Sequence, residues 1–353
     1  MSQLHMAAAV IALSFLSLSA SPVLASQMAE IKYPSQTKTA PMVVAQAEKS
    51  AASLKLLRMA FTSTPDFGAL PIALAVDKLK EQGVELKPTF FNGFPPARTA
   101  LLRGDVEIMQ LNLNSMITSN QQGANLRALM RMAPNEWVLV TPASIKTPMD
   151  LNGKRIGIHG PATLTEQLVK ATIKKYALKS EILVVPGSDA RIQALISKQL
   201  DATPAELADF LELMQSKPRD YHSVIDYRKE YPFLTGSTLI TRKDFTEQQP
   251  ALLQTFVSSY VDITNAIRKN PEGMKPALRK VVPSFLPKFD MNSFDAIYKQ
   301  HLAADYWNPD LTREMAEKTI QFMKDTDQLK GDPPGIDATV DLHFFDKAVQ
   351  TKR

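Results

Sequence analysis

Residues 150–178, DLNGKRIGIHGPATLTEQLVKATIKKYAL, constrain the fold more than any other stretch of the chain. Residues 155–159 have the alternation of a short strand, a Gly-Pro pair breaks it, and apolar residues then recur at helical spacing. Thr163 and Glu166 have the spacing of a capping box, so the helix is predicted to begin at Thr163. Free amides at such a helix end suit an anionic or polar ligand, although many α/β proteins contain several turns of this kind.

The same alternation of strands and helices runs through most of the chain. Strands are expected from residue 54, from 84, up to 111, and at 126–130 and 138–140, with helices between the first three. A second series of strands and helices follows from residue 142 to 241, and beyond residue 246 the pattern is helical. This order predicts the α/β class, with mostly parallel sheets covered on both faces.

The N-terminus has the pattern of a secretory signal peptide. Residues 6–18 form an apolar run that is too short to cross a bilayer, and Val23 and Ala25 give a small-residue cleavage site before Ser26. Residues 1–25 are therefore expected to be removed on export, and mass spectrometry of the mature protein would then find Ser26 first. Residues 26–53 are rich in Ser, Gln, Lys and Ala, and are expected to be a flexible leader.

Composition excludes several classes of site. The chain has no cysteine, which removes disulfides, thiolate metal sites, a cysteine nucleophile and the acylated cysteine of a lipoprotein. Its 41 Lys and Arg exceed 36 Asp and Glu by five, but the basic residues occur as dispersed pairs, so nucleic-acid binding is not expected. The mature protein is therefore predicted to be soluble, periplasmic and not lipid-anchored.

Ligands of open α/β sheets bind outside the carboxyl ends of the strands, and this rule selects the candidate site. The ligand-binding candidates are Ser63, Thr64, Asp66, Phe67, Asn92, Phe94, Asn112, His159, Thr163, Thr165, Ser188 and Glu206. Each polar candidate at a helix start has an alternative role as a helix cap, Asp66, Asn112 and Ser188 among them. For the two phenylalanines the alternative is packing within a lobe, and Trp137 is expected in the core.

These candidates also predict the character of the ligand. They are mainly neutral donors and acceptors, with two carboxylates, Asp66 and Glu206, and the nearest cation is Arg191. An anion would then depend on helix amides and hydroxyls rather than on a bidentate arginine. We expect a small polar organic molecule with a single acidic group, or with an aromatic ring that Phe67 or Phe94 covers.

Motifs of catalysis are missing from the sequence. It contains no GxSxG, HExxH, GxxxxGK[ST] or GxGxxG pattern, and its histidines have no metal-ligand spacing. His159 is the one histidine in the predicted cleft, where a hydrogen-bonded neighbour is the more common role than a catalytic base. We therefore expect a protein that is not an enzyme and has no metal or cofactor.

The order of these pieces resembles a known family. The DLNGKRIGI strand, its turn and helix, VVPGSDARIQALISKQLDA, the return strand with LITRKDFTEQQPALLQTFVSSYVDITNAIRKNPE, and TVDLHFFDKA near the end are similar to periplasmic solute-binding proteins of ABC importers. The branch is that of nitrate, sulfonate, taurine and thiamine-precursor binders (NMT1-like). One departure is that Gln199 and Leu200 precede Asp201 and Ala202, where the family usually has a glycine.

The resemblance implies a two-lobed periplasmic binding protein fold (type II-like) with a helical C-terminal segment. Lobe I would comprise residues 54–141 and 238–353, and lobe II residues 142–237, with hinge strands near Thr141 and Ser237. A ligand held by both lobes would favour the closed state, which an inner-membrane permease and its ATPase could recognise.

The function implied by the resemblance is capture of a small polar solute, such as a sulfonate, nitrate, a pyrimidine or an aromatic acid, by a monomer. Two alternatives remain. One is a periplasmic sensor of the same fold. The other is an enzyme like the thiamine-pyrimidine synthases of fungi, which carry a cysteine cluster for iron that this chain lacks.

Overall fold

The computed structural model describes residues 54–329 and 331–350, and the expected signal peptide and leader lie outside this range. The described residues form one compact unit. None of its helices combines the length and apolar character that crossing a membrane requires.

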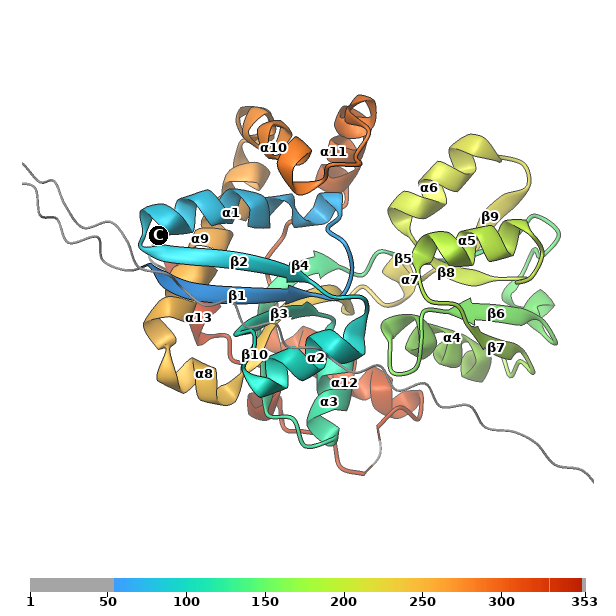
Figure 1. Cartoon of the computed structure of the whole chain (residues 1–353). Helices are drawn as coiled ribbons and strands as arrows, with labels where there is room; N and C mark the ends of the chain where they lie inside the picture. The colour runs from blue at the N-terminus through green and yellow to red at the C-terminus, as the bar shows by residue number, and fades with distance from the viewer. Residues whose placement is uncertain (1–53, 330, 351–353) are drawn as a thin grey trace, which may run out of the picture. The chain divides into compact units, whose positions relative to one another are not determined.

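The larger sheet has five strands in the order β2-β1-β3-β10-β4 (Figure 1). Its strands are β1 (Lys55–Phe61), β2 (Val84–Phe90), β3 (Ile108–Leu111), β4 (Leu126–Pro134) and β10 (Thr235–Arg242). β1 pairs in parallel with β2 and β3, whereas β10 runs antiparallel to both β3 and β4. The carboxyl ends of β1 to β4 and the first residues of β10 therefore lie along one edge of the sheet.

Helices cover both faces of this sheet because the side chains of a strand alternate between its faces. Leu57 and Met59 of β1 pack in one apolar cluster with α1 (Leu70–Glu81) and α9 (Pro250–Lys269), while Ala60 packs in another with α2 (Phe94–Arg103) and α3 (Leu113–Gln121). Figure 1 shows α1 and α2 on opposite sides of β1. Gly104, at φ 81°, ends α2 in the left-handed conformation that favours glycine and turns the chain toward β3.

The second part of the fold has two smaller sheets. β5 (Trp137–Pro142) lies between β8 (Thr203–Glu206) and β9 (Tyr221–Asp226), antiparallel to both, and β6 (Arg155–Ile158) pairs in parallel with β7 (Glu181–Val184). A parallel bridge between Ile156 and Ala202 joins the two sheets, so β6, β7, β8 and β9 all point the same way.

The remaining helices pack around these sheets. They are α4 (Leu164–Lys175), α5 (Ser188–Ile196), α6 (Leu207–Ser216), α7 (Tyr227–Glu230), α8 (Lys243–Gln248), α10 (Pro271–Phe285), α11 (Phe294–Ala303), α12 (Arg313–Asp325) and α13 (His343–Gln350), with short 3-10 turns at Phe67–Ala69, Pro148–Leu151, Met291–Ser293 and Ile336–Ala338. The chain beyond residue 246 is helical between its turns, as its apolar spacing predicts.

Strand pairing bears on where one lobe would end and the other begin. β5 pairs with β8 and β9, which belong to the expected lobe II. A first crossing between β4 and β5, before Trp137, therefore leaves β5 in the same lobe as its paired strands, whereas the expected boundary after residue 141 separates them. The expected hinge residue Ser237 already lies in β10, paired with β4, which favours a second crossing between α7 and β10. We propose these boundaries in place of 141/142 and 237/238.

The segment around α12 contacts residues from the expected lobe II. The ring of Phe322 lies 4.8 Å from that of Tyr231, Gln328 donates to the Gln167 carbonyl at 3.2 Å, and Asp327 pairs with Lys174 at 2.6 Å. Residues after 238 therefore contact both parts of the fold, and are not confined to the first.

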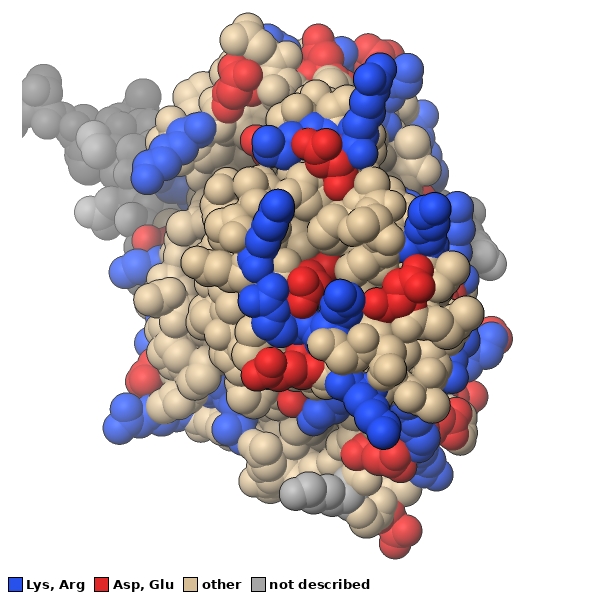
Figure 2. Space-filling view, turned by 90° about the vertical axis from the view of Figure 1, so that its right-hand side faces the viewer, with Lys and Arg blue, Asp and Glu red and all other residues tan. Residues whose placement is uncertain are grey.

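Acidic and basic side chains alternate on the surface. On the face drawn in Figure 2, Lys and Arg lie among Asp and Glu and do not gather into one basic patch. Ion pairs such as Lys175 with Glu230 and Arg155 with Asp201 account for part of this pattern.

Candidate functional site

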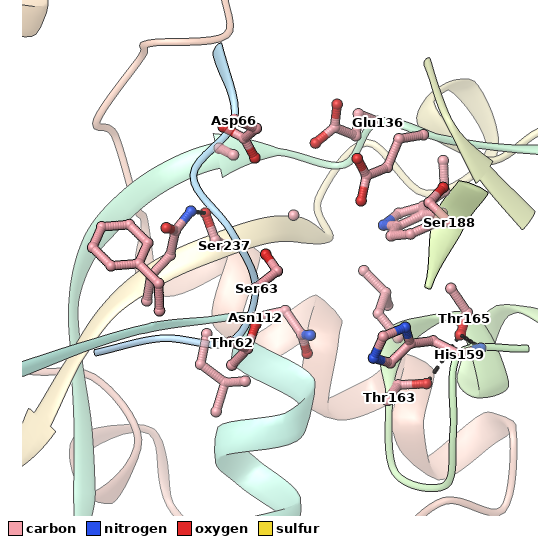
Figure 3. A pocket seen from close by; sticks show the side chains of 18 of the residues that line it. Thr62, Ser63, Asp66, Asn112, Glu136, His159, Thr163, Thr165, Ser188 and Ser237 are labelled. Carbon is pink, nitrogen blue, oxygen red and sulfur yellow. Dashed lines mark hydrogen bonds between the residues drawn. The ribbon is translucent and has the colours of Figure 1, made fainter. Parts of the chain in front are cut away.

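A pocket of about 520 Å³ lies where the strand ends of the two parts of the fold meet (Figure 3). This volume is in the range of small-molecule sites in proteins. The residues that line it are Phe61, Thr62, Ser63, Thr64, Pro65, Asp66, Ala69, Phe94, Gln110, Leu111, Asn112, Ser115, Ala133, Glu136, Trp137, His159, Thr163, Leu164, Thr165, Gly187, Ser188, Asp189, Arg191, Glu206, Asp209, Gly236, Ser237 and Tyr306.

Strand direction explains why these residues meet. β1, β3 and β4 end at the pocket, and β10, which runs the opposite way, begins there. On the other side β6 and β8 end at the pocket, and antiparallel β5 begins there with Trp137. The pocket is therefore lined from all three sheets of the described residues, as the strand-end rule predicts.

Ten of the twelve predicted ligand-binding residues line this pocket. The two that do not are Phe67 and Asn92. Phe67 is buried, with its ring 5.2 Å from that of Phe294 and 5.0 Å from that of His301, so it cannot cover a ligand in the pocket. Asn92 is exposed and does not line the pocket, although Phe94, two residues further on, does.

Several of the ten also cap helices, so the two roles weighed from the sequence coexist. Asn112 accepts from the Ser115 amide at 2.9 Å at the start of α3, and Asp66 accepts from the Ala69 amide at 3.0 Å. The Thr163 hydroxyl caps α4, but the Glu166 carboxylate bonds the Ala162 amide at 2.7 Å rather than that of Thr163. These caps hold the turns in place.

The turn before α4 also makes a direct contact across the pocket. The Ser115 hydroxyl, on α3, donates to the Ala162 carbonyl at 2.8 Å. Ala162 has φ 60°, a left-handed conformation that is uncommon for a residue with a Cβ. Two hydrogen bonds therefore fix this residue, one to its amide and one to its carbonyl.

Neighbouring side chains hold Ser63 and Thr64 less firmly. Both are exposed in the pocket after β1, and no hydrogen bond of either hydroxyl is found among the described residues. In Figure 3 Ser63 and Asn112 lie opposite His159, with Asp66 and Glu136 together at another end of the pocket. The Ser63 hydroxyl can therefore bind a ligand without breaking an existing contact.

The pocket residues that were missed or misjudged from the sequence include Glu136, Trp137, Asp209 and Tyr306. Glu136 follows β4, so the strand-end rule would have found it had it been applied to that strand as well. Trp137 was expected in the core, but it begins β5 and is only partly buried. Tyr306 comes from the loop after α11, far away in sequence, and no local pattern signals its position.

Carboxylates dominate the charge of the pocket. Desolvation raises the pKa of Asp66 and Asp209, raises that of Glu206 to about 8, and raises that of Glu136 well above its usual range. The charges of Glu206 and Asp66 add to the effect on Glu136, and those of Asp209 and Asp66 to the effect on Glu206. Desolvation disfavours the charged form of each carboxylate. In addition, the negative charge of one carboxylate disfavours ionisation of its neighbours.

Neutral donors satisfy part of this cluster. The Tyr306 hydroxyl donates to Glu136 Oε1 at 3.1 Å, and the Ser188 hydroxyl donates to Asp209 Oδ2. Ser188 thus bonds a carboxylate from the first turn of α5, which differs from the capping role considered for it.

The basic groups at the pocket are Arg191 and His159. Arg191, on α5, is 1% exposed and donates to the Gly187 carbonyl at 3.0 Å, with its guanidinium 5.9 Å from the centre of the Trp137 ring. Burial and the charge of Arg191 lower the pKa of His159, so this histidine is neutral at neutral pH. No Lys lines the pocket.

Metal binding finds no support in this geometry. Within residues 54–329 and 331–350, no group of three or more His, Asp or Glu side chains is placed to hold a metal ion. The arrangement suits non-covalent binding of a solute by hydroxyls, amides and carboxylates.

The fold of the chain is similar to that of two-lobed periplasmic binding proteins. It is similar to the periplasmic aliphatic sulphonate-binding protein SsuA from Escherichia coli, with TM-score 0.60 and 18% identity over 82% of this chain and 98% of that one. The periplasmic nitrate-binding protein NrtA from Synechocystis PCC 6803 gives TM-score 0.64 and 9% identity over 85% and 89%. The desulfurization enzyme DSZB gives TM-score 0.57 and 16% identity over 84% and 100%.

These likenesses confirm the expected fold class, α/β with two lobes. No curated protein sequence is detectably similar to this chain. The sequence model of the family described as "NMT1/THI5 like" matches residues 65–274, more than half of the chain. This span includes most of the pocket, from Asp66 to Ser237. The chain therefore belongs to the NMT1/THI5-like family.

Proposed function

We propose that this protein is the substrate-binding component of an ABC importer, which captures a small polar solute in the pocket and delivers it to a membrane permease driven by an ATPase. The observation that carries the proposal is a single pocket whose polar side chains come from the strand ends of both parts of the fold. The folds of a sulphonate binder and a nitrate binder support it.

The pocket suits a cycle of opening and closing. A solute that contacts Ser63 and Asn112 on one side and Glu206 on the other would stabilise the arrangement that brings these residues together. The two chain crossings beside β5 and β10 would act as hinges. Export by the N-terminal segment to the periplasm, as a soluble monomer, belongs to the same proposal.

Two other functions use the same fold. A periplasmic sensor would bind its ligand in the same way but would pass the signal to a different partner. An enzyme is the second alternative, since the desulfurization enzyme DSZB shares the fold. The chain contains no cysteine, so an enzymatic reading would need another nucleophile.

A thermal-shift panel tests binding and separates it from catalysis. The purified mature protein is mixed with sulfonates, nitrate, thiamine precursors, aromatic acids or amino acids. After incubation the compounds are recovered, and their masses are measured by mass spectrometry. A binder at 100 times its dissociation constant adds about 2.7 kcal/mol of stability. The corresponding melting shift is several degrees, at roughly 2–4 °C per kcal/mol for a large domain.

The proposal expects at least one compound that raises the melting temperature and is recovered unchanged. A compound that is converted during incubation would favour the enzyme. No stabilising compound in the panel or in an extract of small metabolites would contradict solute capture in this pocket.

A further inference from the structure

We propose, building on the function above, that the solute is a small organic cation. The geometry points to a protonated amine or amidine nitrogen held among Asp66, Glu136 and Glu206, and to a hydrogen-bond acceptor elsewhere in the same molecule that meets Arg191.

The first observation is that four pocket carboxylates form no salt bridge within the described residues, although the charge of Arg191 acts on Glu206 and Asp209 from nearby. Among the described residues, no Lys or Arg forms an ion pair with Asp66, Glu136, Glu206 or Asp209, whereas most surface carboxylates near a base do. Three of the four accept hydrogen bonds from neutral donors, and no hydrogen bond to the Glu206 carboxylate is found in the same range. Carboxyl groups gathered without a salt-bridge partner fit a ligand that brings a cation.

The second observation is independent of the carboxylates. Arg191 is 99% buried at the pocket wall, and its Nε has no hydrogen-bond partner in the structure. A buried donor without a partner is costly, and a ligand bound beside it can supply the missing acceptor. The Nε proton would take an acceptor such as a carboxylate, sulfonate or carbonyl oxygen.

The charges around the pocket decide between a cation and a simple anion. Five carboxylates line the pocket: Asp66, Glu136, Asp189, Glu206 and Asp209. The other charged or titratable groups near them are Arg191, Arg228, His159 and Tyr306. Arg228 is already paired with Asp226 at 2.7 Å, and His159 is neutral. Nitrate or a simple alkanesulfonate would leave the carboxylates unpaired and meet their repulsion, so Arg191 alone would have to hold it.

A cationic ligand also gives affinity a definite dependence on pH. The cation pairs with ionised carboxylates, and in the free protein desolvation keeps part of the cluster protonated at neutral pH, with the pKa of Glu206 at about 8. Binding therefore releases protons, and the dissociation constant falls as the pH rises from 6 to 8. For an anion held by Arg191 the trend is the opposite, because ionisation of the cluster adds repulsion.

Matched pairs of small molecules test the proposal by calorimetric titration of the mature protein. Each pair differs only in the charged nitrogen: 5-aminopentanoate against 5-hydroxypentanoate, benzamidine against benzamide, and 1,4-diaminobutane against 1,4-butanediol. Nitrate and isethionate serve as anions without an amine. We expect at least one compound with the charged nitrogen to bind at least 10-fold more tightly than the partner that lacks it, and more tightly at pH 8 than at pH 6.

Variants locate the effect. Glu206→Gln and Glu136→Gln keep the shape of the side chain and remove its charge, and each should weaken binding of the preferred amine at least 10-fold. Glu85→Gln, an exposed carboxylate on β2 outside the pocket, is the matched control and should leave affinity unchanged. If either pocket variant fails to fold, the pH trend and the matched pairs still decide.

The outcomes separate the two proposals. If nitrate or isethionate binds and no amine does, solute capture stands and the cationic ligand is wrong. The proposal of a cationic ligand is also wrong if a compound with the charged nitrogen binds with the same affinity as the partner that lacks it. The same holds if it binds equally well at pH 6 and pH 8. Failure of every compound to bind contradicts the cationic ligand, and failure of the wider thermal-shift panel as well contradicts solute capture.

Discussion

Glu206 links the sequence to the electrostatics of the pocket. It ends β8 and has Trp137 as its partner on β5, so backbone pairing places its carboxylate at the pocket edge. Desolvation and the charges of Asp209 and Asp66 then raise its pKa to about 8. The fold thus holds this carboxylate where ionisation is unfavourable, which is common at functional sites.

The raised pKa of Glu206 predicts how the stability of the ligand-free protein depends on pH. Its pKa in the folded state, about 8, is above the unfolded value of 4.5, so between these values the folded protein binds more protons than the unfolded chain. The stabilising contribution is complete below pH 4.5 and is lost as the pH rises through 8. One such proton corresponds to at most about 1.4 kcal/mol per pH unit.

Urea unfolding at pH 6 and pH 8 measures this effect. The wild type should be more stable at pH 6, and Glu206→Gln should reduce the difference, because the amide does not titrate. Glu85→Gln should behave as the wild type, since this side chain is exposed on β2. If the free energy of unfolding changes equally between pH 6 and pH 8 in the wild type and in Glu206→Gln, then Glu206 ionises normally.

The backbones of β4 and β10, two neighbouring strands of the larger sheet, pack closely beside the pocket. β10 begins next to the end of β4, and at Gly236 a Cβ would lie 2.2 Å from the Pro134 carbonyl oxygen. A backbone atom cannot rotate away as a side chain can, so a glycine is required where the two strands approach. Phe322 of α12 contacts Tyr231, and Gln328, just after this helix, contacts Gln167.

Gly236→Ala should therefore destabilise the protein. The overlap with Pro134 forces the β4 and β10 backbones apart, at a cost of about 1–3 kcal/mol. Thermal unfolding of the variant should show a clear fall in melting temperature. Gly335→Ala is the matched control, because no atom lies within 4 Å of its added Cβ, and its melting temperature should change little. Similar melting of the two variants would mean that β4 and β10 can separate without cost.

Local sequence patterns predicted the helices and strands well. They also predicted those pocket residues whose position follows from the direction of a strand. The strand before His159 and the helix capped by Thr163 could be read directly from alternation and spacing. Phe67 was predicted wrongly because its ring is covered by Phe294 and His301, which lie more than 220 residues away in sequence. Tyr306 was missed for the same reason: tertiary packing after α11 brings it to Glu136, and no local pattern contains that information.

At the scale of the whole molecule, strands of the three described sheets end or begin at one pocket, and two chain crossings connect the two parts of the fold. The parallel bridge between Ile156 and Ala202 aligns β6 and β8, so that His159 and Glu206 follow strands ending at the same side. The larger sheet contributes Ser63, Asp66 and Glu136 in the same way. The central claim is that a solute is captured between these strand ends. It requires that the ligand binds in this pocket.

Calorimetric titration of the best stabilising solute into a blocked pocket tests this claim most directly. Ser63→Leu places an apolar side chain in the pocket at a position whose hydroxyl has no hydrogen bond among the described residues, so folding should be preserved. Ser284→Leu, on the exposed side of α10, is the matched control. We predict one binding site per chain in the wild type and in Ser284→Leu, and at least 10-fold weaker binding in Ser63→Leu with an unchanged melting temperature. Equal affinity in all three proteins would show that the solute binds elsewhere.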